Sequence, residues 1–231
     1  MNADHQLDAH RDPHRGQPVV AAGASLEDAA AAMVLVHGRG ASAENILTLT
    51  SALEPAGAPY AGSYAYRAPQ AEGATWYPLS FLAPQADNQP KLDSALAQLH
   101  RVVEEVEAGG VPARRIVLLG FSQGACLSTE YAARHPRRLG GVVAFTGGLI
   151  GPPNTPRDYS GSLDGTPVFL GSGDPDPHVP WWRVEETAEV LQGLGAEVTL
   201  QRYPGIPHTI VDDEIHHARR LMAGVVDQLS A

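Results

Sequence analysis

The sequence predicts one α/β domain with a mainly parallel central sheet and helices on both faces. Short apolar runs alternate along the chain with segments whose apolar residues recur every three or four positions. The first pattern is typical of buried strands, and the second of helices that pack one face on a sheet. Because strands and helices alternate, successive strands are joined by crossovers, which favours a parallel sheet. The 231 residues suffice for one sizeable core.

Five segments are predicted to be strands, and four of them are short apolar runs. Runs of this length, bounded by turn residues, are typical of strands that a parallel sheet buries on both faces. The fifth segment is more polar. The predicted strands are residues 33–36, 116–119, 142–145, 168–170 and 198–203.

Four segments are predicted to be helices, because their apolar residues fall on one face. In the clearest case Leu92, Leu96 and Leu99 recur at spacings of four and three. The helices are expected at about residues 92–106, 123–135, 181–191 and 211–229.

Two connections are long, and the chain begins with a polar stretch. The connection at about 68–88 contains Trp76 and Phe81, and the second spans about 147–166. Long loops in compact domains often form lids or pocket walls, with undetected short structure as the alternative. Residues 1–16 are expected to be a disordered leader, because nothing there can bury a core, and residues 17–231 to be the single domain.

Composition excludes several classes of partner. The formal net charge of −10 disfavours binding to nucleic acid or to an anionic membrane surface. No apolar run is long enough to span a bilayer, and the N-terminal stretch lacks the apolar segment of a secretory signal. The single cysteine, Cys126, excludes an internal disulfide. We therefore expect a cytoplasmic protein.

A serine stands between two glycines directly after a predicted buried strand. Residues 120–124, Gly-Phe-Ser-Gln-Gly, have the pattern G-x-S-x-G, with a predicted helix following. A nucleophile elbow requires this context: a sharp, strained turn holds the serine clear of the sheet, and the glycines let strand and helix approach closely. Ser122 is therefore the candidate nucleophile, with a chance match of the pattern as the alternative.

An acid and a base follow the serine in the order that this elbow requires. A serine hydroxyl needs an adjacent base, and the partners come as acid, then histidine. Asp174 and Asp176 follow the strand at 168–170, and His208 follows the strand at 198–203. These are the strand ends at which α/β sheets build their sites. Position alone does not separate the aspartates, because residues two apart in an extended loop face the same way.

Backbone N–H groups near the serine are candidates to stabilise an oxyanion. The N–H of Gln123 lies at the positive end of the helix that follows Ser122. The second donor is expected in the loop after the first predicted strand, where His37-Gly38-Arg39-Gly40 places the N–H of Arg39. A phosphate-binding loop is the rival interpretation, but the rest of such a motif does not follow.

These stretches together resemble the carboxylesterase and acyl-protein thioesterase/lysophospholipase family of small α/β-hydrolases. The matching stretches are residues 35–38, 120–124, 176–180 and 205–208, and the resemblance covers about residues 33–229. It implies an α/β-hydrolase fold and the following site: Ser122, Asp176 and His208 as the catalytic triad, with the N–H groups of Arg39 and Gln123 as the oxyanion hole.

The resemblance also separates the two aspartates and narrows the substrate. Counted from Gly173, the family run G-x-x-D-x-x-V-P falls on Asp176, which leaves Asp174 as a turn residue. Arg39 replaces the apolar residue usual after His-Gly, and the Trp-Tyr-Pro segment from Trp76 resembles the bacterial esterase branch. These features favour a small soluble ester over a membrane-anchored thioester.

We therefore expect a carboxylesterase that acts on a small-molecule ester through an acyl-enzyme. Thioesterase or lysophospholipase activity from the same triad is the enzymatic alternative, and a binding module on the same fold is the non-enzymatic one. Trp76, Phe81 and His178 are the candidate substrate-binding residues, with the first two walling a short acyl pocket. No metal or other cofactor is expected, and a homodimer is compatible with the family.

Overall fold

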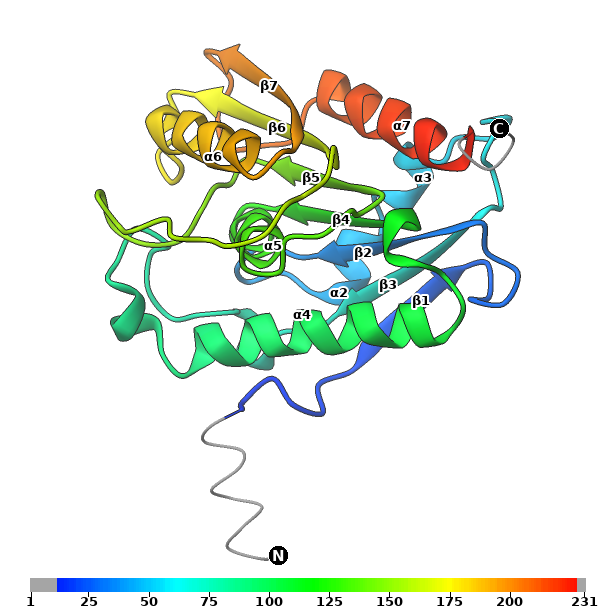
Figure 1. The fold of residues 1–231 in the computed structure, drawn as a ribbon, viewed down its shortest axis with the longest axis horizontal. Helices are drawn as coiled ribbons and strands as arrows, with labels where there is room; N and C mark the ends of the chain where they lie inside the picture. Colours follow the sequence, from blue (N-terminus) through cyan, green and yellow to red (C-terminus); the bar gives the residue numbers. More distant parts are fainter. Residues whose placement is uncertain (1–11, 228–231) are drawn as a thin grey trace, which may run out of the picture.

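The computed structural model describes residues 12–227, which form a seven-stranded sheet between two layers of helices (Figure 1). The strand order is β1-β3-β2-β4-β5-β6-β7, and β1 is antiparallel to β3 while all the other neighbours are parallel. The strands are β1 Val19–Gly23, β2 Ala31–Val36, β3 Tyr64–Pro69, β4 Ile116–Phe121, β5 Gly141–Phe145, β6 Pro167–Asp174 and β7 Glu197–Pro204.

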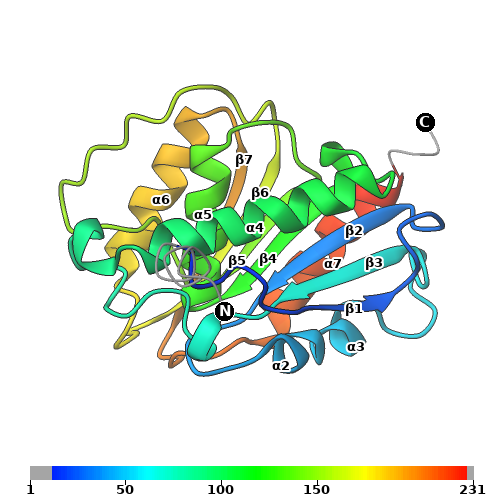
Figure 2. The same ribbon diagram turned by 90° about the horizontal axis from the view of Figure 1, so that it is seen from below.

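Three helices cover each face of the sheet. Helices α4, α5 and α6 share one buried cluster of side chains, and α2, α3 and α7 share the other. Figure 2 shows α4 and α5 on one side of the strands and α2 and α3 on the other. The helices are α2 Ala43–Leu47, α3 Thr50–Leu53, α4 Lys91–Ala108, α5 Gln123–Arg134, α6 Trp181–Gly193 and α7 Asp212–Asp227.

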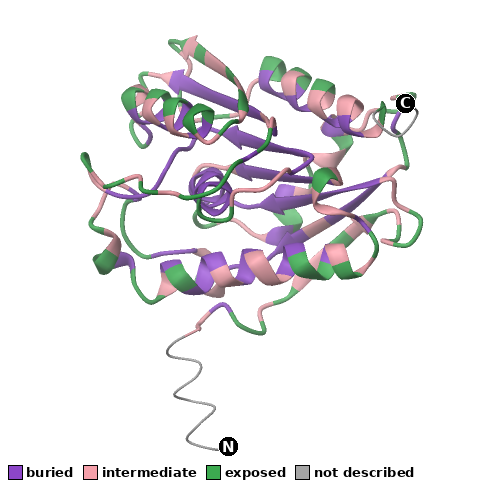
Figure 3. Cartoon of the chain, viewed as in Figure 1, coloured by how far each residue is buried: buried purple, intermediate pink, exposed green. Residues whose placement is uncertain are grey.

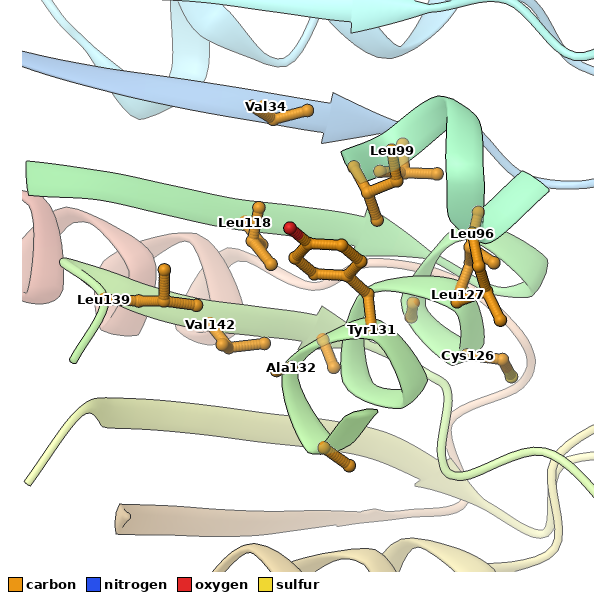
Figure 4. Close-up of a cluster of buried hydrophobic side chains, with 14 of the residues drawn as sticks. Val34, Leu96, Leu99, Leu118, Cys126, Leu127, Tyr131, Ala132, Leu139 and Val142 are labelled. Atoms are coloured by element: carbon orange, nitrogen blue, oxygen red, sulfur yellow. The ribbon is translucent and has the colours of Figure 1, made fainter. Parts of the chain in front are cut away.

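The central strands are buried on both faces, so their side chains alternate between two cores. Val34 of β2 and Leu118 of β4 point to the core under α4 and α5, whereas Met33 and Leu35 belong to the opposite one. Figure 4 shows Tyr131 of α5 inserted between the strands and α4. Figure 3 shows the exposed residues on the outer faces of the helices. This double burial makes the sheet a rigid base for the loops at its edge.

The predicted fold class is confirmed, and the five predicted strands and four predicted helices are all present. Leu229, at the end of the last predicted helix, lies outside the described residues. Strands β1 and β3 and the short helices α2 and α3 were not predicted. Among residues 12–227, no helix is long and apolar enough to cross a bilayer.

The described part of the predicted leader packs on the domain. His14 is fully buried, its ring Nε2–H donates to the carbonyl of Trp76 at 2.9 Å, and its Nδ1 accepts the N–H of Glu72 at 3.0 Å. Asp12 binds the Arg101 guanidinium at 2.9 Å. The prediction of a disordered leader is therefore wrong for residues 12–16, because hydrogen bonds fix them; residues 1–11 lie outside the described residues.

Candidate active site

Ser122 occupies a sharp turn between β4 and α5. Its backbone has φ 55° and ψ −119°, a conformation that non-glycine residues rarely adopt. A Cβ at Gly120 would lie 2.3 Å from the backbone of Gly124, and one at Gly124 would lie 2.0 Å from the carbonyl oxygen of Val36. Both positions therefore require glycine, because α5 starts in contact with the strands. The strained turn lifts the serine side chain to the C-terminal edge of the sheet.

Ser122, His208 and Asp176 form one hydrogen-bonded chain. Ser122 Oγ lies 2.8 Å from His208 Nε2, and His208 Nδ1 lies 2.7 Å from Asp176 Oδ2. The Asp176 side chain is fully buried, whereas that of His208 is 17% exposed. Because the carboxylate only accepts hydrogen bonds, Nδ1 carries the proton and Nε2 presents its lone pair to the serine hydroxyl.

Asp176 and Asp174 have different partners. The second oxygen of Asp176 accepts the backbone N–H groups of His178 at 2.7 Å and Val179 at 2.9 Å, so the loop itself fixes the carboxylate. Asp174 points elsewhere and pairs with Arg202, whose Nε lies 2.7 Å from it. The structure thus places Asp176 beside His208 and keeps Asp174 in a separate ion pair.

The N–H groups of Arg39 and Gln123 lie beside the serine. A Cβ at Gly38 would be 3.5 Å from the Cβ of Ser122, so the backbone that leads to Arg39 runs next to the nucleophile. Gln123 is the first residue of α5. Among residues 12–227 neither N–H has a hydrogen-bond acceptor. Two donors without a partner at a helix start are suited to receive a developing negative charge.

The side chain of Gln123 binds the loop that contains Trp76 and Tyr77. Its Oε1 accepts the N–H of Trp76 at 2.9 Å, and its Nε2 donates to the carbonyl of Tyr77 at 2.8 Å. His37 supports the same loop, since its carbonyl accepts the indole N–H of Trp76 at 2.8 Å. This second role of Gln123 was not predicted. The only sequence signal for it is an amide side chain inside the elbow, at a position where an apolar side chain would pack equally well.

A cavity of about 490 Å³ opens beside Ser122. Its wall combines the loop at residues 77–81, the loop at 38–41 and the two loops that carry the acid and the base. Phe81 and His178 line it, and the His178 ring also contacts the His208 ring edge-on, at 4.9 Å between ring centroids. Leu79, Pro78 and Tyr77, which sequence analysis did not assign to the site, supply much of the remaining apolar wall.

Trp76 does not line this cavity, so its predicted role as a pocket wall is wrong. The side chain is fully buried under the loop, between the rings of His14 and His37, at 5.4 and 4.9 Å between ring centroids. Burial lowers the pKa of both histidines, so both stay neutral partners of the loop. Trp76 supports the wall from behind, and its neighbour Tyr77 reaches the cavity instead.

Cys126 also lines the cavity, four residues after the serine. Burial raises the pKa of its thiol to about 12, so the thiol stays protonated and is a poor nucleophile. Among residues 12–227 no group of three histidine, cysteine or acidic side chains is placed to hold a metal ion. The predicted lack of cofactors stays a prediction, as do the homodimer and the cytoplasmic location.

These features together define an α/β-hydrolase. A serine lies on a strained turn between a strand and a helix of a mainly parallel sheet, and an acid and a histidine follow on later loops. Comparison with known proteins agrees with this class. The chain belongs to the phospholipase/carboxylesterase family, whose model matches residues 16–224.

Known relatives and solved structures support this assignment. A phospholipase/carboxylesterase from Dyadobacter fermentans is 45% identical, with a TM-score of 0.84 over 90% of this chain and 97% of that one. Acyl-protein thioesterase 1 of Gibberella zeae is 37% identical over 49% of each chain. A probable carboxylesterase of Oryza sativa subsp. japonica is 28% identical over 62% of this chain and 54% of its own. The chain thus matches about half the length of these two curated relatives.

Proposed function

We propose that the protein is a serine hydrolase that cleaves carboxylic esters of small soluble substrates through an acyl-enzyme. The observation that carries the proposal is the hydrogen-bonded chain from Ser122 through His208 to Asp176, which starts on a strained turn and faces a cavity. A binding module would need neither the strain at the serine nor a buried carboxylate aimed at a histidine.

The first half of the reaction forms the acyl-enzyme. Ser122 Oγ attacks the ester carbonyl carbon while His208 Nε2 takes its proton. Asp176 keeps the other ring nitrogen protonated and stabilises the imidazolium that forms. The carbonyl oxygen becomes an oxyanion and accepts hydrogen bonds from the backbone N–H groups of Arg39 and Gln123. When the intermediate collapses, His208 returns the proton to the leaving alcohol.

The second half releases the acid and restores the enzyme. His208 removes a proton from a water molecule, which attacks the acyl carbon, and the same two N–H groups receive the oxyanion again. Ser122 then recovers its proton from His208. Every proton in this cycle moves through His208 Nε2, which lies 2.8 Å from the serine oxygen.

A serine-directed probe tests the proposal. A fluorophosphonate should label the wild-type protein once, at the peptide that contains Ser122, and should not label Ser122→Ala. On p-nitrophenyl butyrate the variant should lose turnover by about 10⁴-fold or more, because the nucleophile and its base act as a unit. Circular dichroism checks that the variant is folded. Near wild-type turnover of the folded variant would overturn the proposal.

Thioester hydrolysis is the second candidate, and the similarity to an acyl-protein thioesterase favours it. The same residues would perform it, because only the leaving atom changes from oxygen to sulfur. A comparison of ethyl butanoate with S-ethyl thiobutanoate separates the two preferences. For each substrate, kcat/KM is divided by the rate constant of uncatalysed hydrolysis. We expect this ratio to be higher for the oxygen ester than for the thioester.

A further inference from the structure

The side chain of Arg39 runs along the wall of the cavity that contains Ser122. Its Nη1 donates to the carbonyl of Pro78 at 2.8 Å and to Thr75 Oγ1 at 3.1 Å, and its Nη2 donates to the carbonyl of Leu79 at 2.5 Å. Arg39, Pro78 and Leu79 all line the cavity. The guanidinium therefore joins the loop next to the nucleophile to the apolar wall of the cavity.

The charge of this guanidinium is not neutralised by the protein. All three of its acceptors are neutral, and among residues 12–227 no carboxylate lies within ion-pair distance of it. The residues that line the cavity include no aspartate and no glutamate. Other arginines, such as Arg101 and Arg137, pair with carboxylates.

Two of the five N–H groups of Arg39, on Nε and Nη2, have no acceptor among the described residues. The three hydrogen bonds to Thr75, Pro78 and Leu79 hold the guanidinium in place, so the directions of its two remaining N–H groups are fixed before a ligand binds. A fixed, exposed guanidinium with free donors matches the geometry of a carboxylate. The exposed side chain of Asn45, which also lines the cavity, adds a polar group to its wall.

We propose that Arg39 selects esters that carry a second, negatively charged carboxylate, which its guanidinium binds while Ser122 attacks the ester. This inference rests on the proposed function and names the substrate class. This role also explains the long cationic side chain of Arg39. The side chain binds the carboxylate of the substrate, while the backbone N–H of the same residue donates a hydrogen bond to the oxyanion.

The alternative is that Arg39 only clamps the loop at 75–79 to its own loop. A clamp needs hydrogen bonds but no selectivity for charge, so losing it would slow the hydrolysis of charged and neutral esters alike. The ratio of kcat/KM between a charged and a matched neutral ester therefore separates the two roles, because general damage to the site cancels in the ratio.

Two matched pairs of esters provide this ratio. Monoethyl glutarate and ethyl 4-carbamoylbutanoate place a carboxylate or an isosteric amide on the acyl side. O-Butanoylglycolate and O-butanoylglycolamide place them on the alcohol side. Released acid is titrated at constant pH for wild type, Arg39→Gln, Arg39→Lys and the control Arg137→Gln, which removes one positive charge that pairs with Glu107 outside the cavity.

In wild type we expect the charged ester of at least one pair to be preferred by about 10- to 100-fold, the scale of a charge-assisted hydrogen bond. The preference should fall to about 1 in Arg39→Gln, persist in part in Arg39→Lys, be unchanged in Arg137→Gln and weaken with added salt. A wild-type ratio near 1 in both pairs, or a ratio that survives Arg39→Gln, would overturn the inference. In that case hydrolysis of the neutral esters shows that the proposed function stands, whereas no hydrolysis of any ester refutes both.

Discussion

The amide of Gln123 and the backbone N–H of Trp76 are joined at 2.9 Å, which links the start of α5 to the wall of the cavity. The same tryptophan donates its indole N–H to the carbonyl of His37 and accepts the Nε2–H of His14. The loop at 72–77 is thus tied to the elbow, to the loop that leads to Arg39 and to the N-terminal segment. These three hydrogen bonds fix the loop beside the proposed oxyanion hole.

Replacing His14 by alanine should therefore weaken both stability and activity. The loss of its two ring hydrogen bonds should lower the free energy of unfolding by about 1–3 kcal/mol, and a looser loop should lower kcat/KM several-fold. Urea unfolding and ester hydrolysis measure these effects. The control is Arg15→Ala, because Arg15 is exposed and next in sequence. Equal stability of the two variants would contradict the role of His14.

The destabilisation by His14→Ala should also depend on pH. Burial lowers the pKa of His14 in the folded state below its usual 6.5, so below that pH the unfolded chain binds more protons. The contribution of His14 is therefore complete above pH 6.5 and declines as the pH falls. The gap between wild type and His14→Ala should shrink from pH 7.5 to pH 5.5. A gap that widens toward low pH would show that the ring is charged in the folded state.

The two aspartates of the loop after β6 should differ sharply in their effect on turnover. Asp176→Asn should lower kcat by roughly 10³–10⁴, because the amide cannot hold His208 in the required tautomer. Asp174→Asn removes a partly exposed ion pair with Arg202 and should cost far less. Both variants are assayed on p-nitrophenyl butyrate. The reverse ranking would transfer the role of the acid to Asp174.

The protein should prefer short acyl chains, because Phe81 fills space at the cavity wall. A series of p-nitrophenyl esters from acetate to palmitate should show an optimum at short chains, and Phe81→Ala should move it to longer ones. Trp76→Phe is the matched control: it should lower stability through loss of the bond to His37 without moving the optimum, because Trp76 lies behind the wall. A profile that rises steadily to palmitate in wild type would contradict the prediction.

Glu214 should make the fold less stable as the pH rises. Burial raises the pKa of this carboxyl from 4.5 to about 7, and its Oε1 is buried with no partner among the described residues. Between these values the folded state binds more protons than the unfolded one, so the free energy of unfolding falls with pH by up to about 1.4 kcal/mol per unit.

Glu214→Gln isolates this effect, because the amide oxygen can still accept the N–H of Val211 while staying neutral. Its stability relative to wild type should increase between pH 5 and pH 7 and then level off in urea unfolding experiments. Asp227→Asn, at an exposed side chain that does not contribute to the shifted pKa of Glu214, is the control and should change little over this range. Parallel curves for Glu214→Gln and wild type would refute the prediction.

The sequence allowed the fold class and the residues of the candidate triad to be predicted, because these features have local signals. Ser122 lies between glycines at a strand-to-helix turn, and Asp176 and His208 follow strands in turn-rich loops. Strand β3 was missed because Arg67 and Pro69 interrupt an otherwise short apolar run, and β1 because its side chains are only partly buried. Their strand conformation depends on pairing with distant partners, which periodicity does not report.

The errors about Trp76 and His14 have a common cause. A large ring in a loop is equally suited to face a cavity or the core, and only the tertiary contacts of Trp76 decide between them. A short polar segment has no periodicity, so nothing local reveals that His14 is buried by residues far along the chain. Likewise, the sequence presents Arg39 as a departure from the family pattern but does not show what its side chain contacts.

The ties of the N-terminal segment have a consequence for folding. His14 binds partners that lie 58, 62 and 80 positions later, so a growing chain cannot dock it until Ser94 has been made. His208 likewise reaches Ser122 across 86 positions. The turn at Ser122 is local, whereas such distant closures form slowly because they cost more chain entropy. In a partly folded chain the turn at Ser122 is therefore expected to form before His208 is in place to activate the serine. The appearance of activity during refolding should report these last long-range contacts rather than the collapse of the core.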